Sequence, residues 1–249
     1  MLKSLISRIL LQCGMDLRRA ASVPFGVRWH EDIRFLLQGQ KLETVFDVGA
    51  NIGQTALTLA RNFPESRVFS FEPIPSTFAR LAQNTGREPR IEAVCCALGS
   101  EPGSGKMTTE PLSVSNTLLV EPQTNPKTPV TDVNIDTVSS FCAKRGIQRL
   151  SLLKIDTEGY EMNVLKGAER LLVAKQIEFV LCECDFFRRN GEPHGDFNAI
   201  WQYLSSLNYH VVAFYSGGVD DLGWIWGDVL FRLPRDGQRG RVSCSPFAR

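Results

Sequence analysis

The sequence predicts an α/β fold in which helices cover both faces of a mostly parallel, doubly wound sheet. Strand-like and helix-like segments alternate along most of the 249 residues, and this alternation is typical of successive βαβ units. A turn with two glycines follows the first strand-like run, and a carboxylate ends the second. Sheets of this class bind nucleotide-like ligands at such positions.

Seven short runs rich in β-branched and aromatic residues are predicted strands. They are 44–48, 67–71, 91–97, 150–155, 177–183, 209–215 and 228–233. Helical periodicity marks 55–62, 76–84, 137–144, 161–174 and 197–207. A helix or a long connection separates the first five strands from one another, so we expect them to be parallel. No helical pattern separates the last two strands, which predicts an antiparallel hairpin at one sheet edge.

The segments group into a single globular domain at 44–233, preceded by an N-terminal helical cap at 1–43. An irregular insertion at 99–131 is rich in Pro, Gly, Ser and Thr. It is too long for an ordinary connection, so we expect either an extra hairpin or a loop that covers the substrate. The stretch 234–249 carries Gly, Pro and Arg without periodicity and is expected to be a flexible tail.

Composition narrows the possible partners. The 28 basic and 27 acidic residues nearly cancel, so no nucleic-acid footprint is expected. Residues 1–15 have helical apolar spacing, but Lys3 and Arg8 interrupt it. We expect no membrane span there and allow only weak peripheral contact. The seven cysteines form no CxxC pair, which favours a reducing, cytoplasmic location.

The turn after the first strand indicates the kind of cofactor. Asp47 stands directly before Gly49 and Gly53, and Asn51 lies between the two glycines. The glycines allow a ligand to approach the backbone. A fixed carboxylate would repel a pyrophosphate but suits S-adenosylmethionine, which carries a sulfonium and an ammonium group and no phosphate. Glu72 follows the second glycine by about 20 residues, the spacing at which an acid can bind the ribose hydroxyls.

A second group of charged residues follows the fourth predicted strand. Lys154, Asp156, Glu158 and Glu161 lie within eight residues, directly after an apolar run. Carboxylates are costly to desolvate, and the carboxyl end of a parallel strand is where ligands bind. We therefore interpret Asp156 and Glu158 as functional. Glu161 is expected to have a structural role, because it opens the next helix and meets its dipole favourably.

Three sequence stretches together resemble the FkbM-type methyltransferases, a branch of the class I S-adenosylmethionine-dependent enzymes. They are VFDVGANIGQTA, FSFEPIPSTFARLAQN and LLKIDTEGYEMNVLKGAERLL. The resemblance implies a Rossmann-like sheet of seven strands with an antiparallel last strand. It also implies O-methylation of a hydroxyl on a sugar, glycan or natural-product acceptor. The positions that match the family's cofactor loop are Asp47, Gly49, Asn51 and Gly53; Glu72 matches the ribose carboxylate, and Lys154, Asp156, Glu158 and Glu161 match the fourth-strand signature.

A hydroxyl acceptor must lose a proton during methyl transfer, so a base is required. We assign the catalytic roles to Asp156 or Glu158 as base, with Lys154 limiting how far their pKa values rise. Glu183 and the two histidines His194 and His210 are further candidates, although His210 lies in a strand pattern that predicts a core position. No metal is expected.

Three alternatives to this assignment remain open at the level of sequence. A divalent ion gathered by Asp156, Glu183 and Asp185 is the alternative to metal-free chemistry. An NAD-dependent oxidoreductase would also use a glycine turn and a second-strand acid, although Asp47 counts against pyrophosphate binding. A catalytically silent nucleotide-binding module would keep the fold and lose turnover.

Overall fold

The computed structural model describes residues 23–108, 129–187, 195–215, 217–221 and 223–235. The predicted helix at 1–15, most of the predicted tail, and the middle of the insertion at 99–131 lie outside these residues. So does His194, one of the further base candidates. Among the described residues, no helix is both long enough and apolar enough to cross a membrane.

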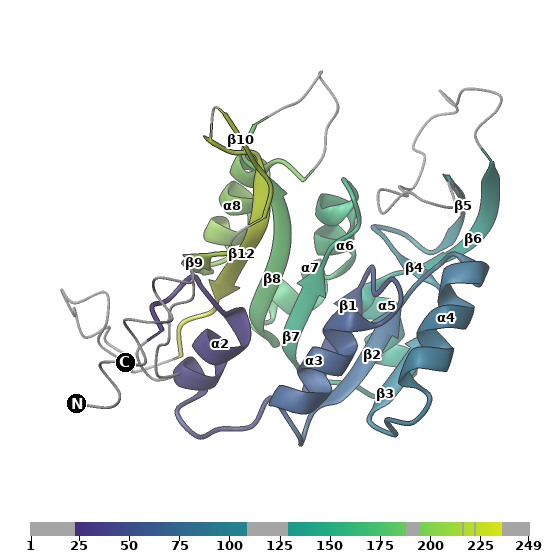
Figure 1. Ribbon diagram of the computed structural model, residues 1–249, viewed down its shortest axis with the longest axis horizontal. Coiled ribbons are helices and arrows are strands. Elements are labelled where there is room, and N and C mark those ends of the chain that lie inside the picture. Colours follow the sequence, from purple (N-terminus) through teal and green to yellow (C-terminus); the bar gives the residue numbers. More distant parts are fainter. Residues whose placement is uncertain (1–22, 109–128, 188–194, 216, 222, 236–249) are drawn as a thin grey trace, which may run out of the picture.

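A seven-stranded sheet forms the centre of the molecule, in the order β3-β2-β1-β7-β8-β12-β9 (Figure 1). Its strands are β3 (Ile91–Val94), β2 (Arg67–Phe71), β1 (Thr44–Val48), β7 (Leu150–Ile155), β8 (Ile177–Asp185), β12 (Trp226–Arg232) and β9 (His210–Phe214). The first five pair in parallel. Strand β12 is antiparallel to both of its neighbours, which confirms the predicted mostly parallel sheet with an antiparallel last strand.

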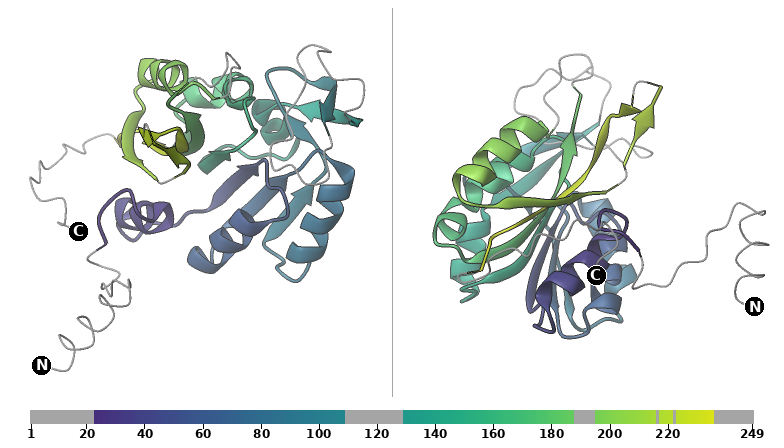
Figure 2. Two further views of the ribbon diagram at one scale, coloured as in Figure 1. Left: turned by 45° about the horizontal axis from the view of Figure 1, so that its top comes forward. Right: turned by 90° about the vertical axis from the view of Figure 1, so that its left-hand side faces the viewer.

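Helices pack on both faces of this sheet (Figure 2). Apolar residues of α2 (Trp29–Leu37) and α3 (Gln54–Asn62) fill one core. The opposite core is filled by α5 (Val138–Lys144), α6 (Glu161–Gly167), α7 (Glu169–Val173) and α8 (Phe197–Ser206). Helix α4 (Pro75–Thr85) begins with Pro75, whose fixed φ suits a first helical turn. The doubly wound architecture expected from the sequence is therefore confirmed.

Two predicted elements are each divided in the structure. The predicted strand at 91–97 ends at Val94, and β4 (Ala97–Leu98) leaves the main sheet to pair with β6 (Val130–Asp136). The predicted helix at 161–174 is split at Ala168 into α6 and α7. Gly167 lies at this break, and a Cβ there would overlap the carbonyl oxygen of Gly99. In both cases the interruption follows from a tertiary contact that local periodicity does not encode.

The described ends of the insertion form a hairpin-like pair of strands. Strand β5 (Gly103–Thr108) runs antiparallel to β6. A separate two-stranded ribbon, β10 (Val219–Asp220) with β11 (Gly223–Trp224), lies between β9 and β12 in the sequence. The sequence patterns did not predict this ribbon, because strands of two residues are too short to show alternation.

Side-chain alternation along the strands explains where the polar groups gather. Val45, Leu152 and Leu181 point into the core under α2 and α3. Residues two positions apart on a strand share a face. Asp47, Lys154 and Glu183 therefore lie on the same sheet face, near the carboxyl ends of three adjacent parallel strands.

Candidate active site

The loop after β1 owes its shape to three residues in the left-handed region. Gly49 has φ 77°, Asn51 has φ 48° and Gly53 has φ 94°. Glycine adopts this conformation without a Cβ penalty, and asparagine tolerates it better than most residues. The turn therefore requires, at each of these three positions, a residue that tolerates a positive φ. Gly53 is also the residue from which α3 begins.

Backbone contacts on both sides hold this loop against its neighbours. The amides of Gly49 and Ala50 donate to the carbonyl of Phe71, at 3.1 and 2.9 Å. On the other side, the amide of Asp156 donates to the carbonyl of Val48 at 3.0 Å. A Cβ on Gly49 would overlap the carbonyl oxygen of Asp156. The close approach of the two loops thus depends on glycine at this position.

Glu72 connects the ends of β1 and β2. It is only 6% exposed, and its two carboxylate oxygens accept from the amides of Asn51 at 3.1 Å and Ile74 at 3.0 Å. Burial raises the pKa of Glu72 to about 7, although the two backbone bonds oppose the shift. A carboxylate has about four acceptor positions, so two further bonds from hydroxyl groups remain possible.

Lys154 lies buried between two carboxylates. Its Nζ lies 2.8 Å from Asp156 Oδ2 and 3.6 Å from Asp47 Oδ1, and the lysine is 4% exposed. Burial by itself would lower the pKa of Lys154, but Asp156 and Asp47 outweigh it and hold the pKa above its usual value. Lys154 therefore remains positively charged and neutralises part of the local negative charge.

Asp47 ends the buried part of β1 and is fully buried, and neither of its carboxylate oxygens accepts a hydrogen bond from the residues that the structure describes. Burial raises its pKa, and Lys154 opposes the rise. The residue was expected from sequence to face a cationic ligand. In the structure Lys154 Nζ lies 3.6 Å from Asp47 Oδ1, and Asp47 has no exposed surface. The negative charge of Asp47 therefore acts on a ligand at a distance and not through direct contact.

Glu161 holds the loop that carries Glu158. Its Oε1 accepts from the amide of Thr157 at 2.9 Å, the hydroxyl of Thr157 at 3.0 Å and the amide of Gly159 at 3.1 Å. Glu158 and Gly159 both have left-handed backbones, with φ 54° and 100°. A non-glycine residue in this region is uncommon and is often found at functional sites. The structural role predicted for Glu161 agrees with these bonds.

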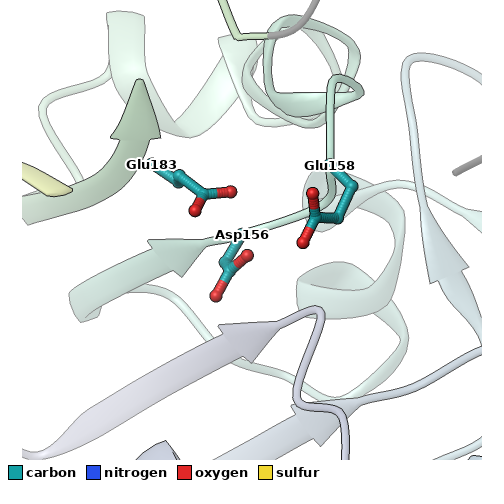
Figure 3. Close-up of side chains that lie close together, drawn as sticks. All are labelled: Asp156, Glu158 and Glu183. Atoms are coloured by element: carbon teal, nitrogen blue, oxygen red, sulfur yellow. The ribbon is translucent and has the colours of Figure 1, made fainter. Parts of the chain in front are cut away.

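Asp156, Glu158 and Glu183 form a carboxylate cluster at the ends of β7 and β8. One oxygen from each lies within 4.8 Å of the others, and Figure 3 shows the three side chains converging. Burial, followed by Asp156 and Glu161, raises the pKa of Glu158 to about 7. Burial, Asp156 and Glu158 raise the pKa of Glu183 to about 9. The cluster can therefore hold and release protons near neutral pH.

Three residues differ in importance from what the sequence indicated. Glu183 was a secondary candidate and is a full member of the cluster. Asp228 was not identified from the sequence, yet it pairs with Glu183 in the β8–β12 register. Burial raises its pKa while Lys154 opposes the rise. The core position predicted for His210 is wrong: this residue is exposed where β9 begins, at the opposite end of the sheet.

The candidate site brings together nearly all of the residues selected from the sequence. Gly49 contacts the Asp156 loop, Asn51 contacts Glu72, and Lys154 joins Asp47 to Asp156. The three-carboxylate cluster that the structure shows includes Glu158 in place of Asp185, which the sequence suggested as a cation ligand. Strand order, glycine loop and acidic ends together define a Rossmann-like protein of the class I S-adenosylmethionine-binding type.

The comparison with protein families agrees with this class. Residues 47–211 match the family model described as the methyltransferase FkbM domain. The match covers more than half of the chain, so the chain belongs to the FkbM methyltransferase family. The methyltransferases of this family use S-adenosylmethionine as their cofactor.

Several methyltransferases are similar to the chain over part of its length. The chain is 30% identical over 155 residues to the hexuronic acid methyltransferase AglP of Haloferax volcanii, covering 61% of this chain and 60% of that one. It is 33% identical over 157 residues to the 31-O-demethyl-FK506 methyltransferase FkbM of Streptomyces tacrolimicus, covering 51% and 60%. Methyltransferase 1 of Beauveria bassiana is 32% identical over 144 residues, covering 50% and 58%. The chain thus spans about 60% of the length of these relatives.

Two solved structures match much of the chain at low sequence identity, with TM-scores below 0.5. The methyltransferase domain of METTL16 is 11% identical with a TM-score of 0.49, covering 83% of this chain and 67% of that one. TrmK of M. capricolum, solved with S-adenosylhomocysteine, is 8% identical with a TM-score of 0.47, covering 86% and 73%.

Proposed function

We propose that this protein transfers the methyl group of S-adenosylmethionine to a hydroxyl oxygen of a sugar, a glycan or a small natural product. One observation carries the proposal: the loop of Gly49 packs directly on Asp156, which belongs to the carboxylate cluster. A cofactor bound at that loop would have a group of proton acceptors beside it. The family assignment and the relatives whose names include a sugar acid or a natural product support this reading.

The residues of the loop fit the proposed cofactor. Gly49 and Gly53 supply the positive φ values that give the turn its shape, and Glu72 keeps acceptor positions free for ribose hydroxyls. The buried carboxylate of Asp47, whose oxygens accept no hydrogen bond within the described part of the chain, favours a positively charged ligand over a pyrophosphate. When bound, the cofactor supplies a methyl group already activated by the positive charge on its sulfur.

The chain's own task is to hold the acceptor and remove its proton. The acceptor oxygen forms a new C–O bond to the methyl carbon as the C–S bond breaks. The electron pair of the C–S bond remains on sulfur. The hydroxyl proton passes to a carboxylate, for which we propose Asp156 or Glu158. Catalytic bases work best with a pKa near the working pH, and Glu158 meets that condition. Lys154 keeps Asp156 oriented through their 2.8 Å contact.

The raised pKa values of Glu158 and Glu183 bear on whether the carboxylate cluster binds a metal ion. We propose a metal-free reaction, with protons on the carboxylate cluster in place of a cation. We also propose a reducing, cytoplasmic location, supported by the five cysteines of the described residues, which are free thiols: Cys95, Cys96, Cys142, Cys182 and Cys184. A hydroxylated small molecule or glycan is the proposed partner, with no nucleic acid.

A methyl-transfer assay tests the proposal. The purified chain is incubated with S-adenosylmethionine labelled in its methyl group, EDTA, and a panel of hydroxylated sugars and natural products. We expect label in an ether product and one S-adenosylhomocysteine per transfer. Cofactor binding without transfer to any acceptor would favour the silent module. Binding of NAD in place of S-adenosylmethionine would favour the oxidoreductase.

Replacing Glu72 by Gln is expected to weaken S-adenosylhomocysteine binding about tenfold or more. The amide keeps the size of the side chain but provides only one acceptor oxygen, so it cannot satisfy both backbone amides and two ribose hydroxyls. Titration calorimetry measures the effect. The exposed Glu65→Gln serves as the charge-matched control and should bind like the wild type. Equal affinities for all three proteins would remove Glu72 from the cofactor site.

With Glu158 as the proton acceptor, the rate of methyl transfer is expected to rise between about pH 6 and pH 8. Glu158 has a raised pKa of about 7, so it is protonated below that pH and becomes a proton acceptor above it. A pH profile of kcat measures this rise, and Glu158→Gln should flatten it. A profile that is unchanged in Glu158→Gln would assign the proton transfer to another group, with Asp156 as the next candidate.

A further inference from the structure

Trp226 stands at the carboxyl-end edge of the site and has an unusual support. The residue begins β12 and is 42% exposed. Its ring lies across the backbone of Gly217 and Gly218. A Cβ on Gly217 would lie 2.5 Å from the indole Cε3, and one on Gly218 would overlap the indole nitrogen. The two glycines therefore let the ring rest on the main chain.

The sheet register places Trp226 beside the acidic side chains. Trp226 pairs with Asp185, and Asp228 pairs with Glu183. Paired residues of antiparallel strands point to the same face, with Cβ atoms about 5 Å apart. Trp226, Asp185, Asp228 and Glu183 thus share one face of the sheet. Glu183 also belongs to the carboxylate cluster with Asp156.

A fixed aromatic ring next to hydrogen-bond acceptors is suited to a sugar. The face of an indole carries partial negative charge and attracts the weakly positive C–H groups on one side of a pyranose. Carboxylates accept hydrogen bonds from the hydroxyl groups at the ring edge. An aliphatic natural product would use the indole but not the acceptors. Both components are present here within one strand pair.

We propose that Trp226 is the stacking platform for an uncharged pyranose ring of the methyl acceptor, with the neighbouring carboxylates accepting from the ring hydroxyls. This inference rests on the proposed function and names its substrate class. The sign of the local charge supports a neutral ring. Among the described residues of the cluster, Lys154 is the cation in contact with carboxylates, and it is shared by Asp47 and Asp156. A uronic acid would add a further acidic group to one that already includes Asp156, Glu158 and Glu183.

Saturation-transfer NMR on the protein saturated with S-adenosylhomocysteine tests the platform. The probes are the methyl pyranosides of glucose, galactose and mannose, with methyl β-D-glucuronide as the charged counterpart. We expect the C–H protons of at least one neutral probe to receive saturation and the glucuronide to bind more weakly. Trp226→Ala should weaken neutral-sugar binding about tenfold, a loss comparable to that of one nucleic-acid base stacked on an aromatic side chain.

Matched variants separate stacking from loss of structure. Trp201→Ala removes a tryptophan of similar exposure, 45%, from α8 on the opposite sheet face, and should bind sugar normally. Trp226→Phe should restore most of the binding. Unchanged binding in Trp226→Ala, equal or tighter binding of the glucuronide, or no neutral probe bound by the wild type would each overturn the inference. S-adenosylhomocysteine affinity, measured in parallel, reports separately on the proposed function.

Discussion

Gly49→Ala is expected to abolish S-adenosylhomocysteine binding and to destabilise the fold. The new methyl group would overlap the carbonyl oxygen of Asp156, and neither backbone segment can move without breaking ladder contacts of β1 and β7. The left-handed φ of 77° adds about 1–2 kcal/mol for a residue with a Cβ. Denaturant unfolding and titration calorimetry measure the two effects.

Gly39→Ala is the matched control for this substitution. Gly39 has φ 86°, close to that of Gly49, but apart from its two chain neighbours no described residue has an atom within 4 Å of the position where its Cβ would stand. It should lose only the conformational part of the stability and keep full cofactor affinity. If the two variants lost the same stability and both bound the cofactor, the close approach of Gly49 to Asp156 would not be required for cofactor binding.

Asp156→Asn is expected to lower the rate of methyl transfer about 100-fold to 10,000-fold, the range associated with general acid–base groups. The amide preserves the shape of the side chain but cannot take a proton, and it leaves Lys154 with a neutral neighbour at 2.8 Å. Cofactor affinity should change little, because Glu72 and the glycine loop remain. Single-turnover kinetics with labelled cofactor measure the chemical step.

Asp132→Asn provides the control for a carboxylate lost elsewhere. Its side chain is 81% exposed on β6 and pairs only with Lys106 among the described contacts, so its rate should match the wild type. A wild-type rate in Asp156→Asn would show that this residue is not the base. The same measurement on Glu158→Gln would then decide whether Glu158 has that role.

The sequence was most informative where local chemistry alone determines the structure. Gly49 and Gly53 could be recognised because a turn with positive φ needs residues of this kind. The ends of β1, β2 and β7 agree with the predicted strands, because short apolar runs bounded by polar residues have clear limits. Parallel strands end at one edge of a sheet, so the proximity of Asp47 to Asp156 also followed.

Three features of the site could not be predicted from the sequence, because they depend on contacts between segments that are distant in the chain. Asp228 is a lone acid in an apolar run, and its place opposite Glu183 follows from the register of β12 on β8. The support of Trp226 by two glycines depends on how the chain returns from β9. The burial of Asp47 was not evident either, because the loop above it has to be folded before its oxygens are covered. Sequence periodicity carries no information about such contacts.

The central claim is that the loop at Gly49 holds S-adenosylmethionine beside the carboxylates that serve methyl transfer. Titration calorimetry of the wild type with S-adenosylhomocysteine and with NAD, repeated on Glu72→Gln, tests it most directly. The structure predicts one molecule of S-adenosylhomocysteine bound per chain, weaker binding in the variant, and no binding of NAD. Binding of NAD with no binding of S-adenosylhomocysteine would contradict it.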